Sequence, residues 1–520
     1  MARDHDISEE STPMLGARDE DHPPPSKYWF QVQRPRTIAI LLSLLIFILC
    51  IAASLLTVPT TRILEDALCH IHYDVEGTAD IDEKLCKDDA IQSQLAYLNG
   101  LVSMLEAVVG LLVAFPYGVL SDRIGRKPVF LLCMGGTMLN VTWNFAILRF
   151  WRTIPVQFIV VAPLFLVIGG GYTVIIAVLY SIAADVESDA HRASAFFLMS
   201  FAFLSGNMVG TLLASKLMTI FSAWAPLLLA YVMIPLGTSV MIFIPETLQA
   251  KPEVHIVEPT GKANILSSFK SQAKKALTHG AKYLSMLKSI SLVMVMFTYL
   301  THWPSIIARG QFFVQYFSKR FDWELANTGY LLALRGGVSI FMLLVALPGI
   351  SSLLLSSKFR MTVPKKDLAL AQFSILAITI GALLAGGNNV PTVISGIIIG
   401  TLGDGISPLC RSLATSFVDS RHTSSLYVLI GVVETIGMMY AGPALAWLFT
   451  TGMKMKGLWL GLPYFWLATL SGLSTLGLCF VKLPKESVKL EEEDALLSDG
   501  DDSNLLRDDE VQIWASVNDR

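Results

Sequence analysis

Long apolar stretches recur along the chain and alternate with short polar segments. A helix needs about 20 apolar residues to cross the hydrocarbon core of a bilayer. We therefore expect about twelve spans, at residues 37–59, 94–119, 129–148, 156–182, 193–217, 223–245, 289–314, 326–349, 367–386, 392–416, 425–449 and 457–481. Charged residues interrupt the seventh, eighth and tenth. The pattern predicts an all-α integral membrane protein.

Longer polar segments divide this pattern into domains. Residues 1–36 and 486–520 are polar tails that we expect to be disordered and cytoplasmic. Residues 248–288 form a hydrophilic linker with seven lysines, which separates the first six spans from the last six. The sequence thus predicts two six-helix bundles, at residues 37–247 and 289–485, joined by a cytoplasmic linker.

The distribution of charge indicates the orientation. The chain is 53% hydrophobic and only 16% charged, whereas soluble domains contain roughly 25% charged residues. The C-terminal tail carries a charge of −9 and the N-terminal tail −2, which leaves +8 on the body between them. With the N-terminus inside, the cytoplasmic loops and flanks hold about 22 Lys and Arg residues and the other side about 10. This bias predicts that both termini are cytoplasmic. The charges are scattered and carry no nucleic-acid signature.

A short motif lies between the second and third spans. Its fixed positions are Gly118, Asp122, Arg123, Gly125, Arg126 and Lys127. The glycines allow tight helix ends and a sharp turn. The aspartate can accept hydrogen bonds from a helix N-terminus or pair with an arginine. The basic residues favour the cytoplasmic face. A basic loop that only sets topology is the alternative interpretation.

The motif resembles the G-x-x-x-D-R-x-G-R-K pattern of the major facilitator superfamily at every fixed position. The resemblance covers residues 37–485 and includes Pro245-Glu246-Thr247 after the sixth span. It implies secondary transport by alternating access, with the motif acting as a latch between conformations. The segment 59–69 is similar to a fungal group of general-substrate transporters, which is distantly similar to the proton-coupled folate transporter.

Two departures bear on the direction of transport. Related drug/proton antiporters commonly carry an arginine in the fourth span, and this chain has none there. They also carry a G-x-x-x-G-P run in the fifth span, where this chain has Gly206, Gly210 and then Thr211. The antiporter signature is therefore incomplete. Export is favoured by the resemblance to fungal efflux proteins, with proton-coupled uptake as an alternative.

Charged residues inside the spans are candidate transport groups, because a charge at that depth is costly unless it faces a cavity or a partner. The carboxylates Glu106, Asp404 and Glu434 are candidates to carry the coupling proton. Arg335 is a candidate counter-ion or clamp for a substrate anion. The remaining cations are Arg411 and, near the end of the seventh span, Arg309. Fixed structural pairs between helices are the alternative.

The tenth span has its own geometric expectation. Asp404 and Arg411 are seven residues apart, so they share a face if the helix is unbroken, although Pro408 lies between them. In the seventh span, Tyr299, His302 and Trp303 can line a cavity.

The cysteines leave one question open. Cys69 and Cys86 share a polar loop, so they either form a disulfide in a lumenal or extracellular loop or remain free thiols. The sequence has no metal-ligand spacing, and no cofactor is expected.

The tails contain two acidic dileucine patterns, at residues 492–497 and 501–506. These patterns fit sorting adaptors and a location in the plasma membrane or a vacuolar or endosomal membrane. Disordered acidic tails without a sorting signal are the alternative.

We expect a proton-coupled secondary transporter of a small organic molecule and not an enzyme, since no nucleophile–base motif or ATP phosphate loop is present. A receptor or scaffold that resembles a transporter without transporting is the alternative from another class.

Overall fold

The computed structural model describes residues 31–75, 81–247, 289–356, 361–418 and 423–483. The predicted linker, C-terminal tail, dileucine patterns and most of the N-terminal tail lie outside these residues. The first half contains α1 Pro35–Tyr73, η1 Leu85–Lys87, α2 Asp89–Ile124, α3 Arg126–Arg149, η2 Val156–Ile168, α4 Gly171–Val186, α5 Asp189–Ile220, α6 Trp224–Ser239 and η3 Val240–Phe243. The second half contains α8 Ile290–Arg309, α9 Gln311–Phe321, α10 Leu325–Phe341, η4 Met342–Ala346, α11 Leu347–Leu355, α12 Val363–Ala385, α13 Val390–Thr401, α14 Ile406–Thr415, α15 Thr423–Met455, η6 Gly457–Gly461 and α16 Leu462–Cys479.

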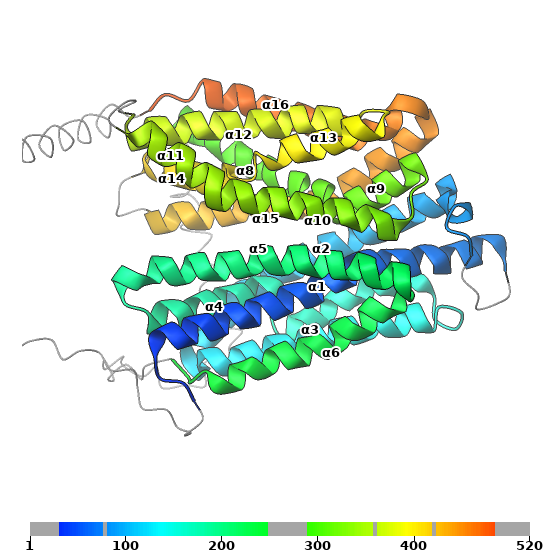
Figure 1. The fold of residues 1–520 in the computed structure, drawn as a ribbon, viewed down its shortest axis with the longest axis horizontal. Helices are drawn as coiled ribbons and strands as arrows, with labels where there is room; N and C mark the ends of the chain where they lie inside the picture. Colours follow the sequence, from blue (N-terminus) through cyan, green and yellow to red (C-terminus); the bar gives the residue numbers. More distant parts are fainter. Residues whose placement is uncertain (1–30, 76–80, 248–288, 357–360, 419–422, 484–520) are drawn as a thin grey trace, which may run out of the picture.

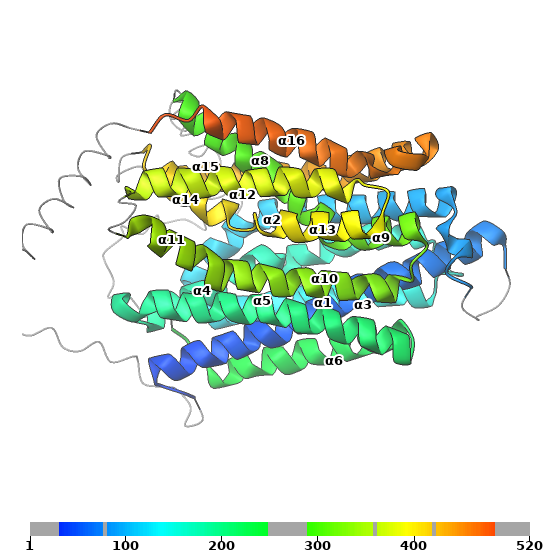
Figure 2. The ribbon, with the colours of Figure 1, turned by 45° about the horizontal axis from the view of Figure 1, so that its top comes forward.

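Twelve helical segments of the described chain are long and apolar enough to cross a membrane, which confirms the predicted number of spans. Figures 1 and 2 show them lying roughly parallel to the long axis in two packed groups. Helices α1 to α6 form one half and α8 to α16 the other. This is the expected pair of helical bundles.

The first span is longer than predicted, because α1 continues to Tyr73. The apolar pattern ends the predicted span at residue 59 and predicts a loop after it, in a segment that includes Arg62, Glu65 and Asp66. Its apolar side chains nevertheless recur at helical spacing, and Ile63, Leu64, Ala67 and Leu68 are all buried. Tertiary packing therefore stabilises a helix beyond the apolar span.

Other spans are interrupted or shorter than predicted. The fourth begins as the 3-10 helix η2 and becomes α4 only after Gly170, and the eighth contains the π-helical turn η4. The seventh ends at Arg309, because Gly310 separates α8 from α9. The tenth is broken between Thr401 and Ile406 into α13 and α14. Membrane helices tolerate such breaks where neighbouring protein satisfies the freed backbone groups.

Each half has its own apolar core. In the first half, buried side chains of α1, α3, α4 and α5 form one cluster, which includes Leu42 and Phe130. In the second half, α8, α12, α14 and α16 supply a corresponding cluster around Val295 and Leu413. Two smaller apolar clusters cross between the halves, one through Ala96 of α2 and one through Val58 of α1.

The outer face of α6 is apolar and exposed. Leu228, Val232 and Leu236 recur every four residues and are 54%, 61% and 60% exposed. Side chains at this spacing share one face of a helix. An apolar exposed stripe on a spanning helix faces lipid.

The two ends of the molecule are named by their landmarks. The latch end contains the α2–α3 turn with residues 118–127, and the disulfide end contains Cys69 and Cys86. Figure 1 shows the start of α1 at the latch end and the end of α1 at the disulfide end.

Candidate functional site

A cavity of about 510 Å³ lies between the two halves. Residues of α1, α2 and α5 line it from the first half, and residues of α8, α10 and α15 line it from the second. Its volume lies in the range of sites for small organic molecules, roughly 300–1,000 Å³. Phe203, Met208, Trp303 and Leu332 make much of the wall apolar. The lining from both halves is what alternating access requires of a substrate site.

Glu106 is the carboxylate that lines this cavity. Its side chain is exposed and makes no hydrogen bond or ion pair with another described residue. Nearby on the same wall, Ser54 Oγ donates to Asn207 Oδ1 at 3.0 Å, and Asn207 Nδ2 donates to the Phe203 carbonyl at 2.8 Å. Glu106 differs from Ser54 and Asn207 in having no hydrogen-bond or ion-pair partner among the described residues.

Asp404 and Arg335 come together in a cluster completed by Arg309 and Ser339. Arg309 Nη1 lies 2.8 Å from Asp404 Oδ1, and Ser339 Oγ donates to Asp404 Oδ2 at 2.8 Å. Arg335 Nη2 is farther from Asp404 Oδ2, at 3.8 Å. Arg335 and Ser339 line the cavity. Asp404 is thus ionically paired, unlike Glu106.

The break between α13 and α14 places Asp404. A Cβ on Gly403 would lie 2.3 Å from the Ser374 carbonyl oxygen, so only glycine permits this approach to α12. Asp404 and Arg411 would share a face only on an unbroken helix, and this helix stops before Asp404 and restarts at Ile406. The break lies at Gly403 and Gly405, before Pro408.

Arg411 instead pairs with Glu434 on α15. Arg411 Nη2 lies 3.0 Å from both carboxylate oxygens of Glu434. Neither residue is part of the lining of the 510 Å³ cavity. The described geometry therefore separates this pair from the wall that holds Glu106 and Arg335.

The latch residues meet at the α2–α3 turn. Arg126 Nη1 bonds to Asp122 Oδ1 at 2.6 Å, and Arg126 Nε lies 3.4 Å from Asp185 Oδ2 at the end of α4. Lys127 Nζ donates to the carbonyls of Ile242 and Ile244. Arg123 is exposed and makes no ion pair with another described residue. The motif thus joins α2 and α3 to α4 and to the segment after α6.

Glu246 completes this turn. Its Oε1 accepts from the Arg126 backbone N–H at 2.8 Å and its Oε2 from that of Lys127 at 3.0 Å. A carboxylate at a helix N-terminus satisfies orphan donors and complements the helix dipole. Gly125 has φ of 108°, and a Cβ there would lie 2.6 Å from Glu246 Oε2. Gly118 has open space around it.

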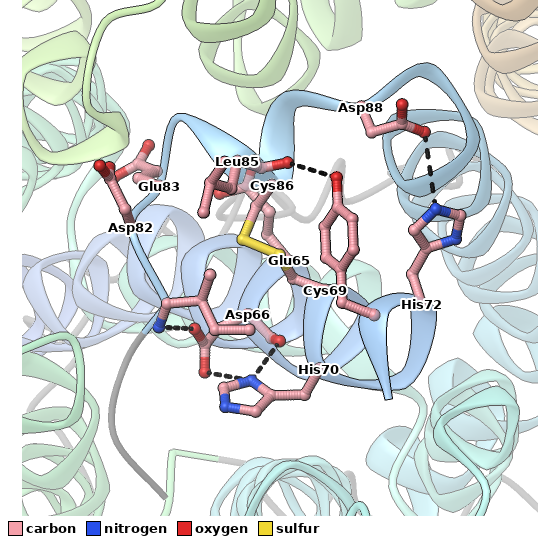
Figure 3. The surroundings of a disulfide bond; sticks show 12 residues. Glu65, Asp66, Cys69, His70, His72, Asp82, Glu83, Leu85, Cys86 and Asp88 are labelled. Carbon is pink, nitrogen blue, oxygen red and sulfur yellow. Dashed lines mark hydrogen bonds and ion pairs between the residues drawn. A yellow bond between two sulfur atoms is a disulfide. The ribbon is translucent and has the colours of Figure 1, made fainter. Parts of the chain in front are cut away.

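The structure joins Cys69 and Cys86 in a disulfide, with their Cα atoms 5.3 Å apart (Figure 3). Beside it, Lys87 Nζ bonds to Glu65 Oε1 at 2.7 Å and to Glu83 Oε1 at 2.9 Å. Gln92 Nε2 also donates to Glu65 Oε1, at 2.6 Å. The disulfide and this largely buried polar cluster fix the segment after α1 against the start of α2.

Polar contacts between the two halves gather at this disulfide end. Lys319 Nζ lies 2.6 Å from Asp89 Oδ1, and Gln315 Nε2 donates to the Gln92 carbonyl at 2.8 Å. The Leu325 backbone N–H donates to Glu83 Oε1 at 2.7 Å. We call these three contacts the end clamp. No comparable hydrogen bond or ion pair joins described residues of the two halves at the latch end.

Close helix packing reinforces the end clamp. A Cβ on Gly100 of α2 would lie 2.8 Å from the carbonyl oxygen of Gly442 on α15. Small residues permit this backbone approach in membrane proteins. The halves are therefore in contact on the disulfide side of the cavity.

A larger cavity, about 820 Å³, lies at the latch end between residues 33–38, 184–192 and 245–247. Its described lining belongs to the first half. It therefore lacks a lining from both halves, and the 510 Å³ cavity is the better candidate for a substrate site.

The roles of Arg309 and Glu246 are not evident from the sequence. Arg309 is one of the charges inside the spans, but its pairing with Asp404 crosses 95 positions of the chain. Glu246 belongs to the Pro245-Glu246-Thr247 pattern, yet nothing in that pattern indicates the distant N–H groups that it caps. Of the aromatic candidates in α8, Trp303 lines the cavity, whereas Tyr299 is buried.

Comparisons with known proteins agree with this architecture. The sequence profile of the Major Facilitator Superfamily matches residues 91–443. The MFS efflux pump atnC of Emericella nidulans is 31% identical, with 85% of this chain and 89% of that protein covered. The efflux pump ustT of Aspergillus flavus is 26% identical, with 87% and 92% covered.

Solved structures share the fold at low sequence identity. A POT family transporter in complex with 5-aminolevulinic acid is 15% identical, with a TM-score of 0.58 and 87% of this chain and 96% of that chain covered. The human organic anion transporter MFSD10 is 18% identical, with a TM-score of 0.51 and 86% and 99% covered. The two-half architecture, the complete α2–α3 motif and the profile match together show that this chain belongs to the major facilitator superfamily of secondary transporters.

Proposed function

We propose that the protein exports a small organic molecule across a membrane by proton-coupled alternating access. The observation that carries this proposal is a cavity between the halves whose wall holds Glu106, a carboxylate that pairs with no other described residue. A group that couples transport to protons must gain and lose a proton as the cavity faces alternate sides. Glu106 is in a position to exchange protons with whatever solvent enters the cavity.

The partners of the other two carboxylates support this assignment. A charged carboxylate inside a membrane protein is costly unless it is paired. Asp404 is held by Arg309 and Ser339, and Glu434 by Arg411, so each has a stable ionised form. Glu106 has no cation beside it among the described residues. Glu106 is therefore the best candidate for the coupling proton, and the two other carboxylates serve as fixed charges.

The proposed direction of transport is inferred from the similar proteins. The proposed orientation in the membrane is inferred from the distribution of Lys and Arg and from the disulfide. Two similar proteins are named efflux pumps, which supports export. The Lys/Arg bias supports a cytoplasmic location for the latch end and both termini. The disulfide supports an extracellular or lumenal disulfide end, since such bonds persist in oxidising compartments. In this orientation the clamped conformation is inward-facing.

A cysteine at position 262 of the linker tests this orientation. The Lys262→Cys variant should react with a membrane-impermeant thiol reagent from the cytoplasmic side. Reaction only from the opposite side would refute the orientation. The plasma membrane and a vacuolar or endosomal membrane are both compatible with it, and sorting adaptors would read the C-terminal tail.

Transport in proteoliposomes under an imposed pH gradient tests the function. A compound panel, screened for altered sensitivity in cells that lack the protein, supplies the substrate. Wild-type protein should drive substrate movement with the gradient. Glu106→Gln should abolish that movement but preserve exchange of labelled for unlabelled substrate, because exchange needs no net proton transfer.

Glu434→Gln is the matched control, since Glu434 lies off the cavity wall. Full gradient-driven transport by Glu106→Gln, Asp404→Asn and Glu434→Gln alike would exclude proton coupling through these carboxylates. Substrate movement in the same direction as the protons would identify an uptake symporter. Absence of any flux for the wild-type protein across the panel would favour a receptor or scaffold.

A further inference from the structure

The cluster around Asp404 contains more positive than negative charge. Arg309 and Arg335 both face Asp404, and the other groups bonded to it or to these guanidiniums are the Ser339 hydroxyl and backbone carbonyls. Two guanidiniums and one carboxylate leave a net charge of +1. An uncompensated charge away from bulk water is costly, so this arrangement favours an additional anion.

The two arginines also have unused hydrogen-bond donors. Arg309 is only 6% exposed, yet its Nη2 has no hydrogen-bond partner among the described residues. Arg335 Nε likewise lacks one. Buried donors that make no hydrogen bond are rare in native proteins and indicate a missing partner. An oxyanion in the 510 Å³ cavity can supply acceptors to Arg335, which lines it.

Position distinguishes the two arginines. Arg309 makes the short contact with Asp404, at 2.8 Å, and is not part of the lining of the 510 Å³ cavity. Arg335 makes the long contact, at 3.8 Å, and lines the cavity. Asp404 thus keeps Arg309 and Ser339 as partners if Arg335 turns toward another anion. Arg335 is the cation that is available to a substrate.

We propose that Arg335 binds a carboxylate or similar oxyanion group of the transported molecule, so that the substrates are organic anions. This inference rests on the proposed transport function and assigns its substrate class. The planar guanidinium matches an oxyanion with two parallel hydrogen bonds. The apolar wall formed by Phe203, Met208, Trp303 and Leu332 suits an aromatic or aliphatic body on the same molecule.

The test compares two probes of nearly equal shape, 1-naphthoate and 1-naphthamide, by thermal unfolding of the full-length protein in detergent. The carboxylate should bind about tenfold or more tightly than the amide, because a hydrogen bond to a charged group is much stronger than a neutral one. Arg335→Gln should abolish this preference. Arg335→Lys should retain part of it, since the charge remains but the paired donors are lost.

Arg149→Gln is the matched control, because Arg149 is exposed at the end of α3, away from the cavity. It should keep the wild-type preference. An equal response of wild-type protein to the two probes would overturn the inference, as would a preference that survives Arg335→Gln. If Arg335→Gln does not fold, the wild-type pair and Arg335→Lys decide the result.

The outcome is independent of proton coupling. Glu106→Gln should keep the preference for 1-naphthoate even though it should lose gradient-driven transport. If the wild-type protein shows proton-coupled transport but no preference for 1-naphthoate, only the substrate class is rejected. If it prefers 1-naphthoate but shows no proton-coupled transport, only the proposed coupling is rejected.

Discussion

Asp404 illustrates how a single charge is stabilised in this protein. Its carboxylate receives hydrogen bonds from Arg309 and Ser339 and lies beside a second guanidinium. Glu434 has one cationic partner, Arg411, whose side chain is 47% exposed. Removal of a partner is costly in the first case, because a buried arginine is left without compensation, and less costly in the second, because the arginine can reach solvent.

We predict that Asp404→Asn destabilises the protein by about 3–5 kcal/mol, the usual cost of breaking a buried ion pair. Thermal unfolding in detergent measures the loss, and Glu434→Gln should show a smaller one. The double variant Asp404→Asn with Arg309→Gln should lose less stability than the sum of its single changes. Additive losses would mean that the contact between these side chains contributes little.

Asp122, unlike Asp404, is largely exposed to solvent, since 66% of its side chain is accessible. We predict that Asp122→Ala leaves expression and thermal stability close to wild type and strongly reduces transport. The reason is that Asp122 positions Arg126, which also contacts Asp185, in a motif proposed to bias two conformations. Transport assays on matched amounts of folded protein measure the effect. A normal transport rate in Asp122→Ala would exclude a role for Asp122 as a latch.

At the scale of elements, the α2–α3 turn depends on one residue without a side chain. Gly125 has φ of 108° and ψ of 159°, a conformation that is essentially restricted to glycine. The Glu246 carboxylate occupies the space that a Cβ would need. The turn and its cap therefore require glycine at this position for two separate reasons.

We predict that Gly125→Ala destabilises the turn by at least about 1–3 kcal/mol, the cost of holding a residue in such a conformation. Gly118→Ala is the control from the same motif, because no atom lies within 4 Å of its added Cβ. The two variants should differ clearly in thermal stability. Equal thermal stability of Gly125→Ala and Gly118→Ala would show that the turn accommodates a side chain at position 125.

At the scale of the whole molecule, the end clamp holds the halves together at the disulfide end. Lys319 contacts Asp89 across the two halves, with the lysine largely buried and the aspartate about half exposed. Alternating access requires these contacts to break when the disulfide end opens. The clamp therefore contributes to the balance between the two conformations.

We predict that Lys319→Ala shifts this balance toward opening at the disulfide end. A cysteine replacing Asn207 in the cavity wall, in a background without the four free cysteines, reports the opening. Its reaction with an impermeant thiol reagent applied from the disulfide end should accelerate about two- to fivefold, as expected from the loss of a partly exposed ion pair.

Lys216→Ala is the control for this shift, because Lys216 is an exposed lysine on α5 outside the clamp. It should leave the labelling rate unchanged. An unchanged rate in Lys319→Ala as well would show that the ion pair does not restrain the opening.

The sequence by itself determined the twelve spans, the two halves and the family. These features follow from local requirements, because in lipid each backbone polar group must be satisfied within its own helix and the apolar run must match the bilayer thickness. The α2–α3 motif is similarly local, since its turn and its Asp122–Arg126 contact lie within ten consecutive residues. Local patterns of this kind can be recognised without knowledge of packing.

Only the tertiary structure decided which charges are paired and which is free. Glu106 was equivalent to Asp404 and Glu434 as long as depth in a span was the criterion. Packing brought Arg309 to Asp404 and Arg411 to Glu434, whereas no cation of the described segments pairs with Glu106. The break before α14 turned Asp404 away from the helical register expected for it. These outcomes depend on how helices far apart in the chain meet, and hydrophobic periodicity carries no information about that.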